Sequence, residues 1–443
     1  MFFKISPDQL RRPVLRAILI SLVGIFPALN TTALAQDIFP VTDKGGLHGA
    51  YIVPIEDFDR VDVQLIVLSG AYDDPNPSGT AHLTEHLAAF SADSTVLRKA
   101  RERDINAKTF NAATVYTNAG QPADLEKLLR LSRAVLDTPK LPDGFAQSEI
   151  DIVERETFLR ERQYPSRWLT RLVLQDLYET PRGRANNTVD DLPNLNLATA
   201  YQFHKDHYVP SNVTVIVSGK IDRDEAAELV TQVFGDTARS TPPAKPWLDQ
   251  KPLLTLRSIK HINTNRLPRD TVQFAKFIDF EDHPSSFELQ GAFFIAVDIL
   301  NTRLENALHF NDVRFLGVDM DWYFATNADL EMTLSVELMP GFALGEAHRN
   351  LRTTMKLLLR EPIGAEEIKR SRQKAIVNAQ HASRTPSGIH GFLKNLAADG
   401  FPPFSPSRFI DLINATTDQE VIDFADKVMQ PSATATILAK KVD

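Results

Sequence analysis

The sequence predicts an α+β protein of two homologous domains, each a mixed β-sheet covered by helices. Its 443 residues exceed one ordinary domain and suit two or three. The segment PSNVTVIVSGKID, which begins at Pro210, recurs in related form as PSATATILAKKVD at Pro431, an offset of 221 residues. β-Branched runs also alternate with amphipathic stretches, which is typical of helices packed over a sheet. An internal repeat of this kind indicates a duplicated unit.

Residues 1–35 have the pattern of a secretory signal peptide. Basic residues precede an apolar stretch at 17–29, and Ala33-Leu34-Ala35 is a typical cleavage site. We therefore expect cleavage near Ala35 and a secreted protein, with the bacterial periplasm as its compartment. An uncleaved anchor is the alternative, but the stretch is shorter than the roughly 20 apolar residues that span a bilayer. No stable membrane anchor is expected.

The first domain is expected at residues 36–239. Its strands should be runs rich in β-branched residues, and its helices should show apolar residues three and four apart. The sequence predicts strands at 61–69, 114–117 and 213–218, and helices at 80–90, 125–136, 149–162 and 199–205.

A proline-rich, charged segment at 240–252 is predicted to be a semi-rigid linker. The second domain then occupies residues 253–443. The pair Pro165-Ser166 recurs at Pro386-Ser387 with the same offset of 221, which supports the duplication.

Composition excludes several classes of function. The formal net charge is −8, so no large basic surface for nucleic acid is expected. The chain contains no cysteine, which excludes disulfides, thiolate zinc sites, iron–sulfur clusters and cysteine nucleophiles. Any metal ion must therefore be held by His, Asp or Glu.

The chemistry is predicted to reside in His82-Leu-Thr-Glu85-His86. Spacings of three and four residues place these side chains on one helix face. Two imidazoles one turn apart can bind one zinc ion, and the carboxylate beside them can take a proton from water. The alternative is a polar helix face with incidental histidines.

A zinc site needs a third protein ligand, and a later helix offers a candidate. Glu154 and Glu161 are seven residues apart, two helical turns, and therefore share a face. The alternative for a helix so rich in glutamate is a solvated surface.

These motifs together resemble the M16 family of inverted-zincin metallopeptidases, which includes pitrilysin, insulin-degrading enzyme and mitochondrial processing peptidase. H-x-x-E-H is followed by E-R-x5-E, as in that family. The lead-in from Gly70 to Thr80 and the segment from Phe203 to Asn212 are also similar. The resemblance covers nearly all of the chain after the signal peptide and suggests a small bacterial two-domain member.

The resemblance implies one Zn²⁺ per chain, with His82, His86 and Glu161 as metal ligands. Glu85 is implied as the general base, and Glu154 as a supporting glutamate. One departure is that Phe90 lies one residue further from the motif than the family pattern places its phenylalanine.

The resemblance also implies contacts with the substrate. The peptide would add as a strand near residues 111–118, with Asn111 and Tyr116 in contact. The family's substrate-gripping arginine and tyrosine would fall on Arg314 and Tyr323, although the surrounding motifs are degraded. The offset of 221 carries the zinc motif onto residues 303–307, RLENA, so the second domain should lack zinc ligands.

The sequence thus predicts a zinc-dependent metalloendopeptidase that hydrolyses peptides or unfolded polypeptide segments. A second M16-like chain, identical or different, is expected to complete the substrate chamber as a dimer. The alternative is a catalytically weak or inactive scaffold, or a peptide-binding subunit of an M16-like complex.

Overall fold

The computed structural model describes most of the chain after residue 37. The described residues are 38–56, 58–75, 78–92, 106–178, 190–253, 255–280, 286–310, 315–324, 329–358, 360–383, 386–398, 401 and 403–442. The predicted signal peptide, residues 1–35, and Arg314 lie outside these ranges. Within them, no helix is both long and apolar enough to cross a membrane.

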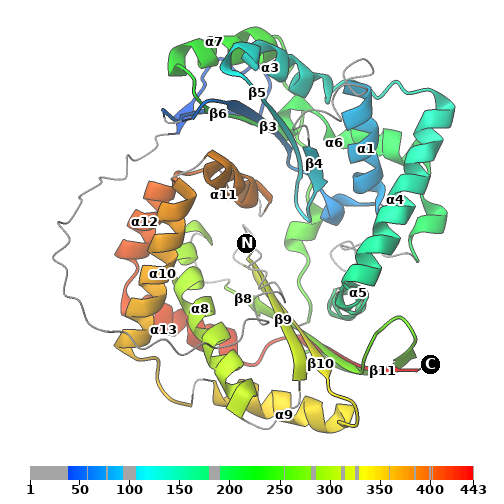
Figure 1. Ribbon diagram of the computed structural model, residues 1–443, viewed down its shortest axis with the longest axis vertical. Helices are drawn as coiled ribbons and strands as arrows, with labels where there is room; N and C mark the ends of the chain where they lie inside the picture. The colour runs from blue at the N-terminus through cyan, green and yellow to red at the C-terminus, as the bar shows by residue number, and fades with distance from the viewer. Residues whose placement is uncertain are drawn as a thin grey trace, which may run out of the picture.

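The first half of the chain forms a six-stranded sheet with the spatial order β1-β2-β6-β3-β5-β4 (Figure 1). β2 and β6 are parallel, and the other neighbours are antiparallel. The strands are β1 (Phe39–Pro40), β2 (Gly49–Pro54), β3 (Val61–Val67), β4 (Asn106–Thr109), β5 (Thr114–Gly120) and β6 (Val213–Gly219). β4 is the edge strand of this sheet. β5, which holds most of the predicted substrate edge at 111–118, lies inside the sheet between β3 and β4.

Helices cover the outer face of the first sheet because alternate residues of its strands are apolar. Val61, Val63, Leu65 and Val67 of β3 pack with leucines of α3 and valines of α7. The α-helices of this half are α1 (Thr80–Ala92), α3 (Leu125–Ala134), α4 (Asp143–Gln163), α5 (Ser166–Leu177), α6 (Leu197–His207) and α7 (Arg223–Phe234). The short 3₁₀ helices are η2 (Ala71–Asp73), η3 (Pro122–Asp124), η5 (Leu192–Asn194), η6 (Pro210–Asn212) and η7 (Pro246–Asp249).

The second half repeats this plan with five strands in the order β7-β11-β8-β10-β9. Its strands are β7 (Arg257–Thr264), β8 (Thr271–Asp279), β9 (Phe315–Phe324), β10 (Asp329–Leu338) and β11 (Thr434–Lys441). Its helices are α8 (Ser286–Phe310), α9 (Leu344–Leu357), α10 (Ala365–Ser383), α11 (Pro386–Ala398), α12 (Pro406–Ala415) and α13 (Asp418–Met429). The predicted α+β class with two homologous domains is confirmed.

The repeated sequence segment forms corresponding strands in the two sheets. β6 starts at Val213 and β11 at Thr434, which preserves the offset of 221. Each pairs in parallel with the first long strand of its half and antiparallel with the second. The structure thus explains why this segment is the most recognisable part of the duplication: both copies are buried strands with the same two neighbours.

The two halves exchange one helix each across their junction. α5 belongs to the first half, yet Leu169, Val173 and Leu177 pack on Phe277 and Ile437 of the second sheet. α11 belongs to the second half and lies under the first sheet (Figure 1). Both helices begin at the repeated Pro-Ser pair, so this exchange is a property of the duplicated unit.

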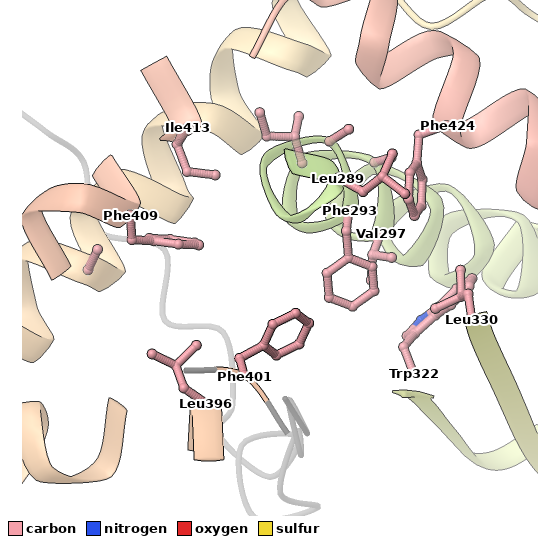
Figure 2. Close-up of a cluster of buried hydrophobic side chains, with 14 of the residues drawn as sticks. Leu289, Phe293, Val297, Trp322, Leu330, Leu396, Phe401, Phe409, Ile413 and Phe424 are labelled. Carbon is pink, nitrogen blue, oxygen red and sulfur yellow. The ribbon is translucent and has the colours of Figure 1, made fainter. Parts of the chain in front are cut away.

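α11 packs into a large apolar cluster that also forms the core of the second half. Ile389 and Leu393 of α11 share this cluster with Ile66 and Val115 of the first sheet and with α8, α10, α12 and α13. Figure 2 shows the portion around α8, where Leu289, Phe293 and Val297 lie between Phe409 and Trp322.

We expect Leu393→Ala to destabilise both halves together. Leu393 is fully buried, and a buried Leu→Ala change typically costs about 2–5 kcal/mol of unfolding free energy. Urea unfolding should show one transition that shifts as a whole. Leu357→Ala, at a site 45% exposed on α9, is the control and should shift it little. Two separate transitions, with only one displaced, would contradict the account.

Candidate metal centre

The predicted zinc motif lies on α1, and the loop before the helix fixes where α1 begins. Asp74 is buried and accepts hydrogen bonds from the backbone N–H groups of Gly79 and Ala81, both at 2.6 Å. Gly79 has φ +93°, a conformation that a side chain would strain. Burial raises the pKa of Asp74 to about 7, although the two backbone donors act in the opposite direction.

The structure brings together His82, His86 and Glu156. One ligand atom from each lies within 4.8 Å of the others. The Glu156 carboxylate is 3.4 Å from His82 Nε2 and 3.9 Å from His86 Nε2. Nε2 of His82 and Nε2 of His86 therefore face the same carboxylate. The side chain of Glu156 is 43% exposed, so this position is accessible to solvent.

A second glutamate on α4 orients one of the histidines. His86 Nδ1 lies 2.9 Å from Glu149 Oε2, and Glu149 is almost fully buried. A carboxylate behind an imidazole fixes its tautomer, so that Nε2 is the acceptor nitrogen. The other histidine has no such partner: Nδ1 of His82 is buried without a hydrogen bond.

Neighbouring charges and hydrogen bonds shift the pKa values of His86 and Glu156. Burial opposes protonation of His86, but the hydrogen bond to Glu149 and the charges of Glu85 and Glu156 outweigh it, and the pKa of His86 is raised. The hydrogen bond with His82 is the main reason that the pKa of Glu156 is lowered. An ionised carboxylate beside two imidazoles is a ready cation site.

Glu85 is buried beside the group and held by the edge strand. Thr109 of β4 donates a hydrogen bond to Glu85 Oε2 at 2.8 Å. Behind it, the hydroxyl groups of Tyr116 and Tyr208 lie 2.7 Å apart, and Tyr116 also donates to the Glu85 carbonyl at 3.4 Å. Tyr116 is buried and its hydroxyl supports α1, while its predicted contact with substrate stays a prediction.

The glutamates predicted for the zinc site lie elsewhere on α4. Glu161 is five residues beyond Glu156, about 140° around the helix, and lies 3.8 Å from Arg266 of the second half. Glu154 is likewise outside the group of His82, His86 and Glu156. The structure thus brings Glu156 and Glu149, which have the same spacing of seven, next to the two histidines, whereas the ligand role of Glu161 and the supporting role of Glu154 stay predictions.

α4 packs against α1 through a stripe of buried residues. Ala146, Ile150, Val153 and Thr157 are the buried residues on the face of α4 that packs towards α1. Glu149 and Glu156 lie on one flank of this stripe, and Glu154 and Glu161 lie on the other. Apolar periodicity therefore does not distinguish the two pairs, which differ only in how α4 packs against α1.

The remaining predicted positions lie at the junction of the halves. Asn111 Nδ2 donates to the Tyr72 hydroxyl at 3.4 Å. Tyr323 is buried against Tyr72 and Trp247 of the linker segment. The predicted second-domain counterpart of the zinc motif, residues 303–307, lies on α8, where Arg303 pairs with Glu367 at 2.6 Å and ties α8 to α10.

Comparison with known proteins agrees with this architecture. The family profile described as "Peptidase M16 inactive domain" matches residues 194–374. A zinc protease of Helicobacter pylori, PqqE, is 29% identical over 227 residues, covering 46% of this chain and 49% of that protein. An uncharacterised zinc protease of Mycobacterium leprae is 28% identical over 193 residues, covering 40% and 43%. The chain spans a little under half the length of these curated relatives.

Solved structures share the fold over nearly the whole chain. A protease from Helicobacter pylori superposes with a TM-score of 0.74 at 15% identity, covering 91% of this chain and all of that one. The periplasmic protease PqqL from Escherichia coli superposes with a TM-score of 0.67 at 17% identity, covering 92% of this chain and 48% of that one. The chain is thus similar to M16 peptidases in the profile that matches residues 194–374, in two zinc-protease relatives and in its two-domain fold.

Proposed function

We propose that the protein is a zinc-dependent endopeptidase that acts on peptides or unfolded polypeptide segments. The observation that carries this proposal is the convergence of His82, His86 and Glu156 next to the buried carboxylate of Glu85. A scaffold without activity is the alternative, but it would require neither this group nor a carboxylate beside it.

The residues fit a zinc ion. Two imidazole nitrogens and one carboxylate oxygen are a donor set typical of catalytic zinc, which keeps a further position open. Glu149 already orients His86, and the exposed side of Glu156 leaves access for a substrate. A zinc ion bound there would supply Lewis acidity and would make water a better nucleophile near neutral pH.

Glu85 is the residue that we assign to proton transfer. Its carboxylate would accept a proton from the attacking water and return it to the amine that leaves. Thr109 holds one carboxylate oxygen, which fixes the orientation of the group. Glu85 is adjacent to His86 in sequence and three residues from His82, so α1 holds its buried carboxylate next to the ligands.

The edge strand β4 is the proposed place for the substrate backbone. β4 pairs with β5 on one side, and its other edge can accept an extended peptide by strand addition. Thr109 lies at the end of this strand and contacts Glu85, so a peptide on this edge would pass the base. This replaces the segment 111–118 as the expected docking strand.

We further propose that a second M16-like chain completes the substrate chamber. This chain covers 46% of pitrilysin at a TM-score of 0.64, and 48% of PqqL, so each of those chains is about twice as long as the matched region. A homodimer and a heterodimer both satisfy this argument. Export to a periplasm stays a prediction from residues 1–35.

Removal of Glu156 should abolish zinc binding, whereas removal of Glu161 should not. Glu156→Ala takes away the only carboxylate in the group of possible ligands found among the described residues. Glu161→Ala, on the same helix, is the matched control. Metal analysis of the purified proteins should show zinc lost from the first and kept by the second. The reverse result would restore the ligand set that the sequence motif implies.

Replacement of the base should separate binding from catalysis. Glu85→Gln keeps the shape of the side chain but cannot accept the proton, so zinc content should be unchanged. Cleavage of a quenched-fluorescence peptide should fall by at least about 10²- to 10⁴-fold, the contribution that is typical of general base catalysis. Full activity of Glu85→Gln in the presence of bound zinc would exclude this role.

Glu149→Gln should weaken the site without destroying it. The amide can still meet His86 Nδ1 but lacks the charge that raises the basicity of the imidazole, and changes behind metal ligands typically cost about 10–100-fold in affinity or activity. Zinc affinity measured by competition with a chelator should fall within this range. Glu154→Gln, on the same helix, should leave it unchanged, and equal losses in both variants would rule out a specific role for Glu149.

A further inference from the structure

A strap of residues 245–251 joins the two halves and is fixed to both by side chains. It is part of the predicted linker and contains η7. Lys245 pairs with Asp73 of the first half at 3.1 Å, and Lys251 pairs with Asp279 of the second half at 2.9 Å. The two aspartate side chains are only 1% and 8% exposed. Each lysine thus holds a buried carboxylate.

Asp73 is held by two residues of the strap. Lys245 Nζ lies 3.1 and 3.2 Å from the two carboxylate oxygens of Asp73, and Trp247 Nε1 donates to one of them at 3.0 Å. Lys245 also donates to Ser69 Oγ at 2.7 Å and to the carbonyl group of Leu68. A buried charge is tolerated when it is paired and hydrogen-bonded. The strap therefore supplies the positive charge that keeps Asp73 in its place.

Asp73 belongs to η2, whose backbone is bonded to the turn that follows β4. The N–H groups of Ala71 and Tyr72 donate to the carbonyl groups of Phe110 and Asn111 at 2.9 and 2.7 Å. If either segment shifted alone, these backbone groups would lose their partners, which is costly. The position of Asp73 is therefore coupled to the position of the turn.

Close packing reinforces this coupling. Tyr72 and Ala112 form one buried cluster with Trp247 of the strap and Tyr323 of the second half. The ring centroids of Tyr72 and Trp247 are 5.0 Å apart. Gly70 lies so near the turn that a Cβ atom at this position would be 2.3 Å from one of the carbonyl oxygens of the turn. η2 and the turn therefore have little room to move independently.

The turn begins directly after Thr109, the residue that holds the proposed base. Thr109 ends β4 and donates to Glu85 Oε2 at 2.8 Å. Figure 1 shows β4 beside α1, the helix that carries Glu85. A series of contacts therefore runs from Lys245 through Asp73 and the turn to Glu85. We propose that Lys245 is a positioning residue for Glu85 and for the substrate edge of β4, an inference that rests on the proposed peptidase function.

Loss of the Lys245 ammonium group should move the base. The Asp73 carboxylate would remain buried without its positive partner, which is strongly unfavourable, so η2 would shift to bring it to water. The turn and Thr109 would follow because of their backbone bonds to η2. A displacement of about 1 Å far from the chemistry can lower turnover by about 100-fold. The proposed zinc ligands lie on α1 and α4 and should stay in place.

The first test compares three variants of the strap. Lys245→Met removes the charge and keeps the length of the side chain, whereas Lys245→Arg keeps the charge. Lys251→Met, the matched control, breaks the ion pair with the second half. In Lys245→Met, kcat for a quenched-fluorescence peptide should fall about 10- to 100-fold with zinc content unchanged, and Lys245→Arg should regain most of it. Loss of zinc from Lys245→Met, no rescue by arginine, or an equal loss of kcat in Lys251→Met would overturn the proposal.

A double variant tests the route through Thr109. Thr109→Val removes the hydroxyl group that donates to Glu85 and should lower kcat by itself. If Lys245 acts through Thr109, adding Lys245→Met should lower kcat by no more than about 2-fold further, because the effects of residues in one network do not add. Losses that multiply would show that Lys245 acts independently of Thr109, which would contradict the proposed role.

Amide hydrogen exchange separates failure of this role from failure of the proposed function, because it requires no activity. In the purified protein with zinc added, Lys245→Met should speed exchange in residues 70–74 and 106–114 and leave β11 unchanged, since the opening is local. Lys251→Met should leave residues 106–114 unchanged. This pattern supports the positioning role even if the unaltered protein cleaves nothing. Unchanged exchange at 106–114 in Lys245→Met, or faster exchange throughout the chain, overturns the role even if kcat falls.

Discussion

The reciprocal packing of α5 and α11 is the constraint on which the rest of the structure depends. Each helix leaves its own half and covers the inner face of the other sheet, so neither sheet is buried without its partner half. α5 also reaches the loop before α1, where Arg171 donates to Ser78 at 3.1 Å and pairs with Asp191 at 2.8 Å. The relative position of the halves is thereby coupled to the start of the helix that carries the zinc motif.

The candidate site depends on this coupling because its parts come from separate elements. α1 supplies His82, Glu85 and His86, α4 supplies Glu149 and Glu156, and β4 supplies Thr109. Arg266 of the second half pairs with Asp190 at 2.6 Å and approaches Glu161 near the end of α4. The second half lacks the zinc motif at the corresponding helix, yet through Arg266 it contacts the end of the helix that carries Glu149 and Glu156.

Much of this arrangement could be predicted from the sequence, and the errors have physical causes. The duplication was visible because β6 and β11 are buried on both faces and retain a shared pattern. His82, Glu85 and His86 were found because three neighbours on one helix turn form a local motif. The third ligand is a contact between helices, and two pairs of glutamates with identical spacing compete for it. The packing of α4 against α1 brings Glu149 and Glu156 to the histidines, and this contact between helices cannot be read from the motif. That β4 is the edge strand and β5, with Tyr116, lies inside the sheet depends on long-range pairing, which the sequence pattern does not show.

Anomalous diffraction from crystals of the zinc-loaded protein tests the central claim most directly. The account predicts one strong anomalous peak on α1, about 2.0–2.2 Å from Nε2 of His82, Nε2 of His86 and a carboxylate oxygen of Glu156. Glu85 should lie beside the peak without ligating it. A peak coordinated by Glu161, or zinc bound only away from His82 and His86, would contradict the proposed metal centre and the function that rests on it.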